Sequence, residues 1–352
     1  MQRLKKFSGI LVFMTIGLAI YILWGQGLFT NVEDDFSGSC TPIAGAPGSE
    51  DLTIDQARGI VYFSSMDRVK QAQGLAQRGA ILSLDLNDPN ASMIDLTTSL
   101  GLGLVPHGIS LWKNPLFGPD RLFVINHFDG RHSVEIFEID ADGLTTHSLT
   151  HVSTVRGSAI VSPNDLVAVS ANQFLVTNDS RWTKGNLALM EKVLRLPVSN
   201  IVYYNGVRFS EAIGAIAFAN GINISADGQQ LYLASMGTGS VLVFDRDITN
   251  GGYKSPWTIS VPGQPDNIEV MPDGSLLVGL HTKMLSLMTS MLDPEAAIPS
   301  RIVRIDLING DISNVYDNSG TQIAAASVGS IYQGKLVIGA IADPDILVCH
   351  MP

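Results

Sequence analysis

The sequence repeats a pair of adjacent residues, mostly polar, directly before a short apolar segment. Five copies are plain: Glu50-Asp51 before LTI, His107-Gly108 before ISLW, Asn164-Asp165 before LVAV, Asn220-Gly221 before INIS, and Asp266-Asn267 before IEV. The second members are spaced by 57, 57, 56 and 46 residues, and a degenerate sixth copy with Val328 follows 61 residues later. Repeats of this length are typical of propellers. The pattern therefore predicts several copies of one structural unit arranged around a common axis.

Two further strand-like segments follow each copy in the same order. One series begins at Ile60, Leu122, Phe174, Leu231, Leu276 and Leu336, and the other contains ILSLDL, VEIFEID, KVLRLP, SVLVFDRD, RIVRIDL and DILVCH. Apolar alternation or short apolar runs between turn residues predict strands. A β-sandwich also contains many short strands, but it does not predict six ordered copies of one triplet. We therefore expect an all-β fold, a six-bladed β-propeller with four-stranded blades.

Two stretches depart from this pattern and predict helices. Residues 184–195 (KGNLALMEKVLR) and 283–292 (KMLSLMTSML) are rich in long unbranched side chains that favour helix. One interpretation is an ordinary connection between blades. The other is a wall or lid over the mouth of the central channel, where methionine offers an adaptable apolar surface.

The amino-terminal region, residues 1–30, is expected to stand apart from a propeller domain of residues 31–352. Residues 7–24 carry no charge and follow the basic stretch RLKK. About 18 apolar residues nearly span a bilayer core, and no A-x-A cleavage pattern follows. We favour an uncleaved signal-anchor that exports the propeller to the extracellular, periplasmic or lumenal side. The alternative is a cleaved signal peptide and a secreted protein.

The charge and the cysteines bound the function further. A net charge of −11 disfavours a nucleic-acid partner, because phosphate binding needs clustered lysine and arginine. The chain has two cysteines, Cys40 and Cys349, near the two ends of the propeller domain. In an exported protein such a pair favours a disulfide, which would join the first and last strands and close the ring. The alternative is two buried thiols.

The recurring pairs place oxygen-bearing side chains at one end of the channel, since the innermost strand of each propeller blade lines it. Five of them form a candidate metal site with two negative charges: Glu50, Asn164, Asn220, Asp266 and Asn267. Calcium takes six to eight oxygen ligands of these types, whereas zinc prefers cysteine and histidine and magnesium keeps more water. The second members Asp51 and Asp165 are candidates for a deeper calcium site. Turn formation is the ordinary explanation for any single Asn or Asp here, but not for the whole set.

Histidines also occupy positions near the expected channel mouth. His107 stands where a ligand stands in other copies, and His127 ends the neighbouring strand. Two histidines at the same end of adjacent strands favour a proton relay, because histidine titrates near neutral pH. His281 also follows a strand and is a candidate pocket residue. We expect His132 and the remaining histidines to be structural.

Two other positions carry weaker signals. Asp179 follows Asn178 at a strand end and either supports the ligands or turns the chain. Asn90, Asn178 and Asn223 begin glycosylation sequons, and of these we expect Asn90 to be exposed.

Several of these segments resemble the paraoxonase (arylesterase/lactonase) family. They are, in order, GSEDL, PHGIS, PNDLVAV, TND, FANGINIS, the DN of PDNI and SVGSIYQGKLVIG, and they run from about Cys40 to the carboxyl terminus. The pair FANGINIS and SEDL is highly specific. In this chain Ser180 follows TND, where the family usually has histidine, and the segment 283–292 is richer in methionine than its family counterpart.

The resemblance implies a propeller with two calcium ions in its channel, a terminal disulfide and a retained hydrophobic amino terminus. Carried over by residue, it implies a catalytic calcium on Glu50, Asn164, Asn220, Asp266 and Asn267. It implies a structural calcium on Asp51, Asp165 and the backbone carbonyl of Ile109. The family's histidine dyad corresponds to His107 and His127, and its supporting acid to Asp179.

We therefore expect a calcium-dependent hydrolase of lactones and aryl esters. Calcium would polarise the carbonyl and His107, oriented by His127, would deprotonate the attacking water. Asp266 is an alternative base or nucleophile. Two other functions stay open at this point. One is hydrolysis of phosphotriesters or sugar lactones by the same fold, and the other is a non-catalytic interaction propeller stabilised by calcium.

Overall fold

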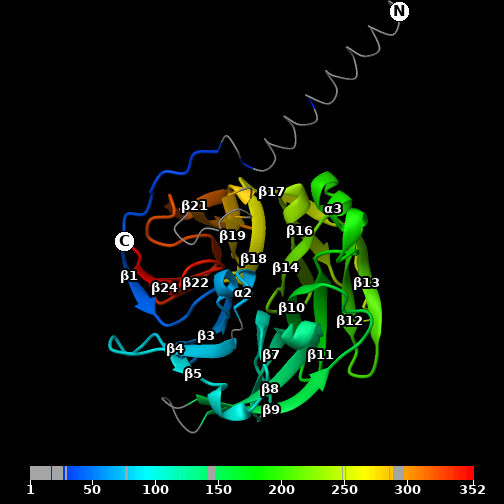
Figure 1. The fold of residues 1–352 in the computed structure, drawn as a ribbon, viewed down its shortest axis with the longest axis horizontal. Coiled ribbons are helices and arrows are strands. Elements are labelled where there is room, and N and C mark those ends of the chain that lie inside the picture. The colour runs from blue at the N-terminus through cyan, green and yellow to red at the C-terminus, as the bar shows by residue number, and fades with distance from the viewer. Residues whose placement is uncertain are drawn as a thin grey trace, which may run out of the picture.

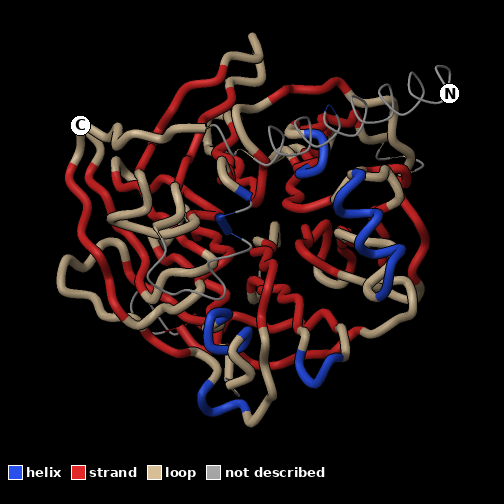
Figure 2. Tube along the Cα trace, turned by 45° about the horizontal axis from the view of Figure 1, so that its top comes forward, coloured by secondary structure: helices blue, strands red, loops and turns tan. Residues whose placement is uncertain are grey.

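The computed structural model of the chain is a six-bladed β-propeller, as the repeats predicted (Figure 1). It describes residues 30–75, 78–116, 118–141, 147–247, 249, 251–284, 286–287 and 297–352, together with Gly17 and Gly27. Six antiparallel four-stranded sheets surround a central axis, and loops with a few short helical segments connect the strands (Figure 2). The expected helix within 7–24 and most of 283–292 lie outside the described residues. Within the described part of the chain, no helix is long and apolar enough to cross a membrane.

The strands of each blade follow one another in sequence, from the channel outward. Blade 1 holds β2 Ser49–Asp55, β3 Ile60–Ser65, β4 Ala80–Asp85 and β5 Ile94–Asp95. Blade 2 holds β6 Pro106–Trp112, β7 Asp120–Asn126, β8 Ser133–Ala141 and β9 His147–Val155. Blade 3 holds β10 Pro163–Ser170, β11 Gln173–Asn178, β12 Ser199–Tyr204 and β13 Phe209–Ile216. Blade 4 holds β14 Ala219–Ile224, β15 Gln230–Ser235, β16 Ser240–Asp245 and β17 Trp257–Ser260.

The last two blades complete the ring. Blade 5 holds β18 Gln264–Val270, β19 Leu276–His281, β20 Ser300–Ile305 and β21 Ile312–Asn318. Blade 6 holds β22 Ala326–Tyr332, β23 Lys335–Ala340, β24 Asp345–His350 and, from the start of the domain, β1 Ser39–Ala44. The apolar core lies between neighbouring sheets. In one cluster, for example, Leu52 and Phe63 of blade 1 pack in the same group as Val337 of blade 6.

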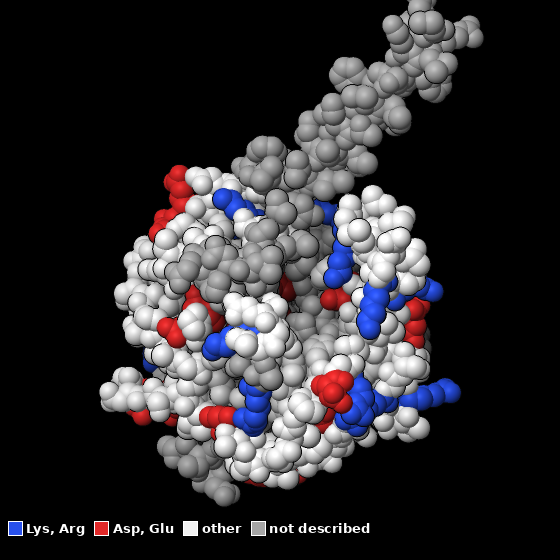
Figure 3. Space-filling view, viewed as in Figure 1, with Lys and Arg blue, Asp and Glu red and all other residues white. Residues whose placement is uncertain are grey.

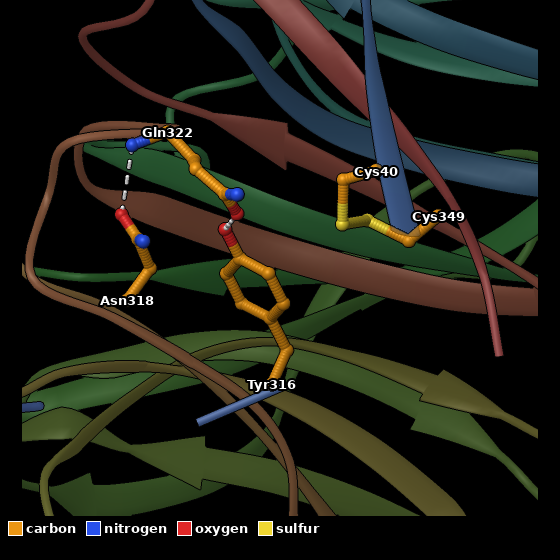
Figure 4. The surroundings of a disulfide bond; sticks show 5 residues. All are labelled: Cys40, Tyr316, Asn318, Gln322 and Cys349. Atoms are coloured by element: carbon orange, nitrogen blue, oxygen red, sulfur yellow. Dashed lines mark hydrogen bonds between the residues drawn. A yellow bond between two sulfur atoms is a disulfide. The ribbon is translucent and has the colours of Figure 1, made fainter. Parts of the chain in front are cut away.

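The ring is closed by the pairing of β1 with β24. Cys40 lies directly opposite Cys349 in this antiparallel pair, and the two form a disulfide across 309 residues. This confirms the disulfide expected from the sequence. Cys349 packs in one apolar cluster with the buried ring of Tyr316 from blade 5, whose hydroxyl donates a 2.9 Å hydrogen bond to Gln322 (Figure 4).

Each inner strand carries a β-bulge at its polar pair. The register between the first and second strand of every blade shifts there, with one extra residue on the inner strand. Side chains of consecutive residues normally alternate between the two faces of a strand, and a bulge changes that direction locally. In blades 1 and 3 the amide nitrogen of the extra residue donates to a hydroxyl of the second strand, from Asp51 to Ser64 and from Asp165 to Thr177. The bulges therefore allow the side chains of both members of a pair to point toward the channel.

Glycine is required as the second member in blades 2 and 4 because the blades approach closely. A Cβ atom at Gly108 would lie 2.4 Å from an oxygen of Asp165 and 2.6 Å from its Cα. A Cβ atom at Gly221 would lie 2.3 Å from the carbonyl oxygen of Asp266. Each glycine thus makes room for the polar pair of the next blade, which has an acid or an amide as its second member.

The helices whose full bounds lie among the described residues are few and short. They are α2 Arg68–Ala72, α3 Gly185–Leu194 and the 3-10 turns η1 Thr98–Leu100, η2 Phe128–Gly130 and η3 Met236–Thr238. The helix predicted at 184–195 is confirmed as α3, which exposes most of its apolar side chains. Its one buried residue is Glu191, whose carboxylate accepts hydrogen bonds from the backbone of Arg181 and Trp182 at 2.9 and 3.0 Å. This contact attaches the helix to the segment that follows β11.

Candidate active site

The first members of four polar pairs, together with the second member Asn267, lie at the ends of the inner strands. Glu50, Asn164, Asn220, Asp266 and Asn267 are all buried, and they come from blades 1, 3, 4 and 5. Among the described residues, four buried oxygens in this set receive no hydrogen bond: Glu50 Oε2, Asn164 Oδ1, Asn220 Oδ1 and Asn267 Oδ1. A buried polar atom left without a partner costs about 1–3 kcal/mol. Four such atoms in one predicted ligand set indicate that a partner beyond the described residues completes the site.

Glu50 is held from several sides. The amide of Asn267 donates to its backbone oxygen and to Oε1 at 2.9 and 3.1 Å. His107 Nε2 lies 3.4 Å and Arg68 Nη2 3.9 Å from Oε2. Burial raises the pKa of Glu50, but the charges of His107 and Arg68 and these hydrogen bonds outweigh it and lower the pKa to about 2. Glu50 is therefore an anion at neutral pH.

Asp266 has both carboxylate oxygens engaged. Asn220 Nδ2 donates to Oδ1 at 2.6 Å, and Nε2 of the buried His281 lies 2.6 Å from Oδ2. Burial raises the pKa of Asp266, and His281 partly offsets this effect. His281 is thus placed to orient Asp266.

The second members Asp51 and Asp165 form a separate group. They line a small cavity of about 60 Å³ with Ile109 and Glu269. Asp51 Oδ2 accepts the backbone N–H of Ile109 at 2.7 Å, which links blade 1 to blade 2, and Asp165 in the same way links blade 3 to Ile222 of blade 4. Burial, with neighbouring negative charge, holds the pKa of both aspartates well above its usual range.

The donor set fits a hard cation. Amide and carboxylate oxygens are the ligands that calcium takes in proteins, and the oxygens without hydrogen bonds are of these two types. In the part of the chain that the structure describes, no group of three or more His, Cys, Asp or Glu side chains is placed to hold a metal ion. The amide-rich composition accounts for this, because three of the four free oxygens belong to asparagine. Zinc, which prefers nitrogen and sulfur, is disfavoured.

A row of three histidines leads away from Glu50. His107 Nδ1 lies 3.0 Å from His127 Nε2, and His127 Nδ1 lies 2.7 Å from His132 Nδ1. Burial, with repulsion from His107, His132 and Arg68, lowers the pKa of His127 to about 2. The sequence predicts the first two members of the row but a merely structural role for His132. The register of the β7–β8 hairpin places His132 in the row. Asn126 pairs with Ser133 in this hairpin, so His127 and His132, the residues just beyond this pair, meet.

Other residues near the mouth were not recognised from the sequence. Arg68, on the short helix α2, approaches Glu50, and Glu269 adds a carboxylate to the cavity of Asp51 and Asp165. No motif marks either residue. Asn90 is exposed, as expected, whereas Asn178 is buried and Asn223 is half-buried.

A cavity of about 220 Å³ adjoins this group on the side of α3. Its walls come from the carboxyl-terminal part of α3, from η3 and from the residues that precede the pairs of blades 4 and 5. They include Leu196, Phe218, Met236 and Gln264, and Asp179 contributes a carboxylate. Asn220 Nδ2 lies 3.9 Å from the sulfur of Met236, so the cavity adjoins the candidate ligands. The space-filling view shows a hollow on this face, with basic side chains on the α3 side (Figure 3).

Comparisons with known proteins identify the family to which the chain belongs. The chain is 32% identical to serum paraoxonase/arylesterase 2 of Gallus gallus over 303 residues, which covers 84% of this chain and 83% of the relative. It is 29% identical to serum paraoxonase/lactonase 3 of Oryctolagus cuniculus, with 86% of each chain covered. The fold is similar to a gluconolactonase from Xanthomonas campestris, with a TM-score of 0.56, 18% identity and coverage of 92% and 99%. The Arylesterase family model matches residues 48–351, and this chain belongs to that family.

Proposed function

We propose that the protein is a calcium-dependent hydrolase of lactones and aryl esters. The observation that carries the proposal is the set of four buried oxygens without hydrogen bonds at the channel mouth. Family membership supports the reaction class, since relatives are named as arylesterases and lactonases.

Two calcium ions are part of the proposal. The catalytic ion would be held by Glu50, Asn164, Asn220, Asp266 and Asn267, and the structural ion by Asp51, Asp165 and the backbone carbonyl of Ile109. A bound catalytic calcium supplies Lewis-acid polarisation of the substrate carbonyl and compensates developing negative charge. The protein's contribution is to fix the ligands, as Asn267 does for Glu50 and His281 for Asp266.

His107 is the proposed general base. Its Nδ1 is occupied by the contact with His127, which leaves Nε2 on the side of Glu50. Among the described residues, Nε2 makes the 3.4 Å contact with that carboxylate, and the imidazole side chain is 20% exposed. Asp266 is less suited to accept a proton or attack a carbonyl, because hydrogen bonds already engage both of its oxygens. We therefore assign deprotonation of water to Nε2 of His107, oriented by His127.

The cavity beside α3 is the proposed binding site for the substrate. Phe218 and Met236 give it an apolar wall within reach of Asn220. Pockets of this kind bind ligands largely through apolar contact, with a few polar groups that fix orientation. Its volume of about 220 Å³ suits a small ring or aryl group near the metal site.

We also propose that the propeller is exported. The disulfide between Cys40 and Cys349 supports this, since disulfides persist in oxidising compartments. Attachment through residues 7–24 stays a prediction. Fractionation of expressing cells tests it: a propeller that remains in the soluble fraction with its first 30 residues intact would contradict the anchor.

The decisive experiment is a panel of lactones and aryl esters, assayed before chelation, after chelation and after return of calcium. We expect turnover that is lost with the chelator and restored by calcium. Addition of magnesium or of zinc in place of calcium is the control, and neither ion should restore turnover fully. Absence of calcium-restored turnover on every compound would contradict the proposed function.

A further inference from the structure

His127 and His132 meet because of the way in which one hairpin ends. Asn126 of β7 is opposite Ser133 of β8, so His127 and His132 are the next residues outward on the two sides. The turn between them includes η2, and the backbone N–H of His127 donates to Val105 at 3.0 Å. The Asn126 side chain accepts the N–H groups of Val105 and Phe128. The hairpin end is thus fixed by four backbone groups.

The three rings form a continuous row from the channel outward. Ring centroids are 5.2 Å apart for His107 and His127 and 4.9 Å apart for His127 and His132, in edge-to-face arrangements. The two nitrogen contacts, 3.0 and 2.7 Å, are within hydrogen-bond distance. Each contact uses a different nitrogen of His127, so this ring connects the other two.

The row has one arrangement of protons that leaves His107 able to act as a base. In it, His107 Nδ1–H donates to His127 Nε2, and His127 Nδ1–H donates to His132 Nδ1. His107 Nε2 then keeps its lone pair toward the channel. His132 is the acceptor that this arrangement needs, because the tautomer of an imidazole is set by the hydrogen bond at its other nitrogen.

A nearby carboxylate favours the arrival of a proton at His132, the outer end of the row. Burial lowers the pKa of His132, but the negative charge of Asp179 acts in the opposite direction. Asp179 is itself held by its backbone N–H, which donates to the Ser162 carbonyl at 2.9 Å, and by the Ser162 hydroxyl, which donates to its carboxylate. His132 is half-buried, and the two residues before it, Gly130 and Arg131, are exposed.

We propose that His132 is the outer end of a three-histidine proton path that connects the channel with solvent. This rests on the proposed hydrolase function. His132 acts through His127, so its role is positioning and proton relay rather than contact with substrate. It keeps His127 in the tautomer that frees His107 Nε2, and it receives the proton that leaves the site.

The chemistry requires such an exit. In lactone hydrolysis one O–H bond of water breaks and its oxygen bonds to the carbonyl carbon. The ring C–O bond breaks and the leaving oxygen takes up a proton. The products are a hydroxy acid, which ionises at neutral pH, and therefore one released proton per turnover. Along the row each imidazole gains a proton at one nitrogen and loses one at the other, so no charge accumulates on buried His127.

The first test compares His132→Ala, His132→Gln and the control His350→Gln, on phenyl acetate and a six-membered lactone, with calcium saturating. His350 is exposed at the end of β24, far along the sequence from the row. We expect kcat to fall about tenfold in both His132 variants with KM unchanged, less than the roughly hundredfold that loss of proton transfer itself costs. Added imidazole should restore His132→Ala in a saturable way and leave the control unaffected.

A merely structural His132 predicts a different result. His132→Gln would then keep the wild-type kcat, since its amide still accepts the hydrogen bond from His127, and imidazole would not restore His132→Ala. Either finding overturns the relay. Thermal unfolding of each variant establishes that it is folded before kcat is compared.

A second measurement does not depend on turnover. Nitrogen-15 shifts of the histidine rings report the resting tautomer, and we expect protonation of His127 at Nδ1 in the wild type and its loss in His132→Ala. Protonation at Nε2 in the wild type would overturn the path. A wild type that hydrolyses no ester or lactone would instead contradict the proposed function, and the shifts would still decide the tautomer.

Discussion

The two members of the recurring pairs build two regions with opposite hydrogen bonding. At the channel mouth, three first members and the second member Asn267 leave four buried oxygens without a hydrogen bond, and the cavity beside α3 adjoins them. The second members Asp51 and Asp165 accept backbone N–H groups from neighbouring blades and line a cavity of about 60 Å³. Residues that are adjacent in the sequence thus differ in the hydrogen bonding of their side chains. Oxygens that have no partner among the described residues depend on a ligand alone, whereas those of Asp51 and Asp165 join blade to blade even before an ion binds.

Removal of one free oxygen should have the largest effect. We expect Asn164→Ala to lower kcat/KM on a lactone by about hundredfold or more, because one electrostatic contact at the reacting centre is lost. After chelation, its thermal midpoint should match the wild type, since Asn164 Oδ1 has no hydrogen bond to lose. Asn172→Ala, in the exposed turn at the other end of the same strand, is the control. If Asn164→Ala lowered the thermal midpoint equally with and without calcium, the channel-mouth oxygens would not differ in role from those of Asp51 and Asp165.

Opening the ring should weaken both regions together. The double variant Cys40→Ser with Cys349→Ser is expected to lose about 2–5 kcal/mol of unfolding free energy, because the crosslink no longer restricts the unfolded chain. Denaturant titration measures this loss, and reduced wild type is the matched comparison. Folded molecules should keep their activity at 25 °C. Selective loss of calcium affinity at one region only would argue against a shared scaffold.

The joining role of the second members predicts a third effect. Asp165→Asn should lower the unfolding free energy by about 2 kcal/mol, because an amide group replaces an oxygen that faces the N–H of Leu166 or Ile222. The loss should persist after chelation, unlike that of Asn164→Ala. Asp88→Asn, in an exposed loop, should change stability by less than about 0.5 kcal/mol. Denaturant titration in both conditions is the measurement.

The last prediction concerns the pH dependence of stability. The folded state holds His127 neutral down to a pKa of about 2, whereas the unfolded chain takes up a proton below about 6.5. This contribution to stability is complete above pH 6.5 and is lost as pH falls toward 2, by at most about 1.4 kcal/mol per unit. In chelator, His127→Gln should flatten the profile relative to wild type and His350→Gln should not. Identical slopes in all three would contradict a buried neutral His127.

The sequence predicted the propeller and the ring closure because both depend on periodic apolar strands and on where the cysteines fall. It also brought together the candidate ligands, since each precedes an inner strand. It did not predict His132, because only the register of the β7–β8 hairpin places that residue beside His127. Nor did it predict Arg68 beside Glu50. The sequence did not predict the β-bulges either, because one extra residue in a strand does not show as a change in the apolar pattern.

The position of β1 in blade 6 has a consequence for biosynthesis. This strand emerges from the ribosome first, yet its partner β24 is among the last segments to be made. Until then β1 and the outer edge of the incomplete ring expose unpaired backbone, a state open to pairing with other chains. The first five blades can form during synthesis, but the ring cannot close before β24 has left the ribosome. A truncation that removes the final strand should therefore be prone to aggregation, even though every proposed metal ligand is present.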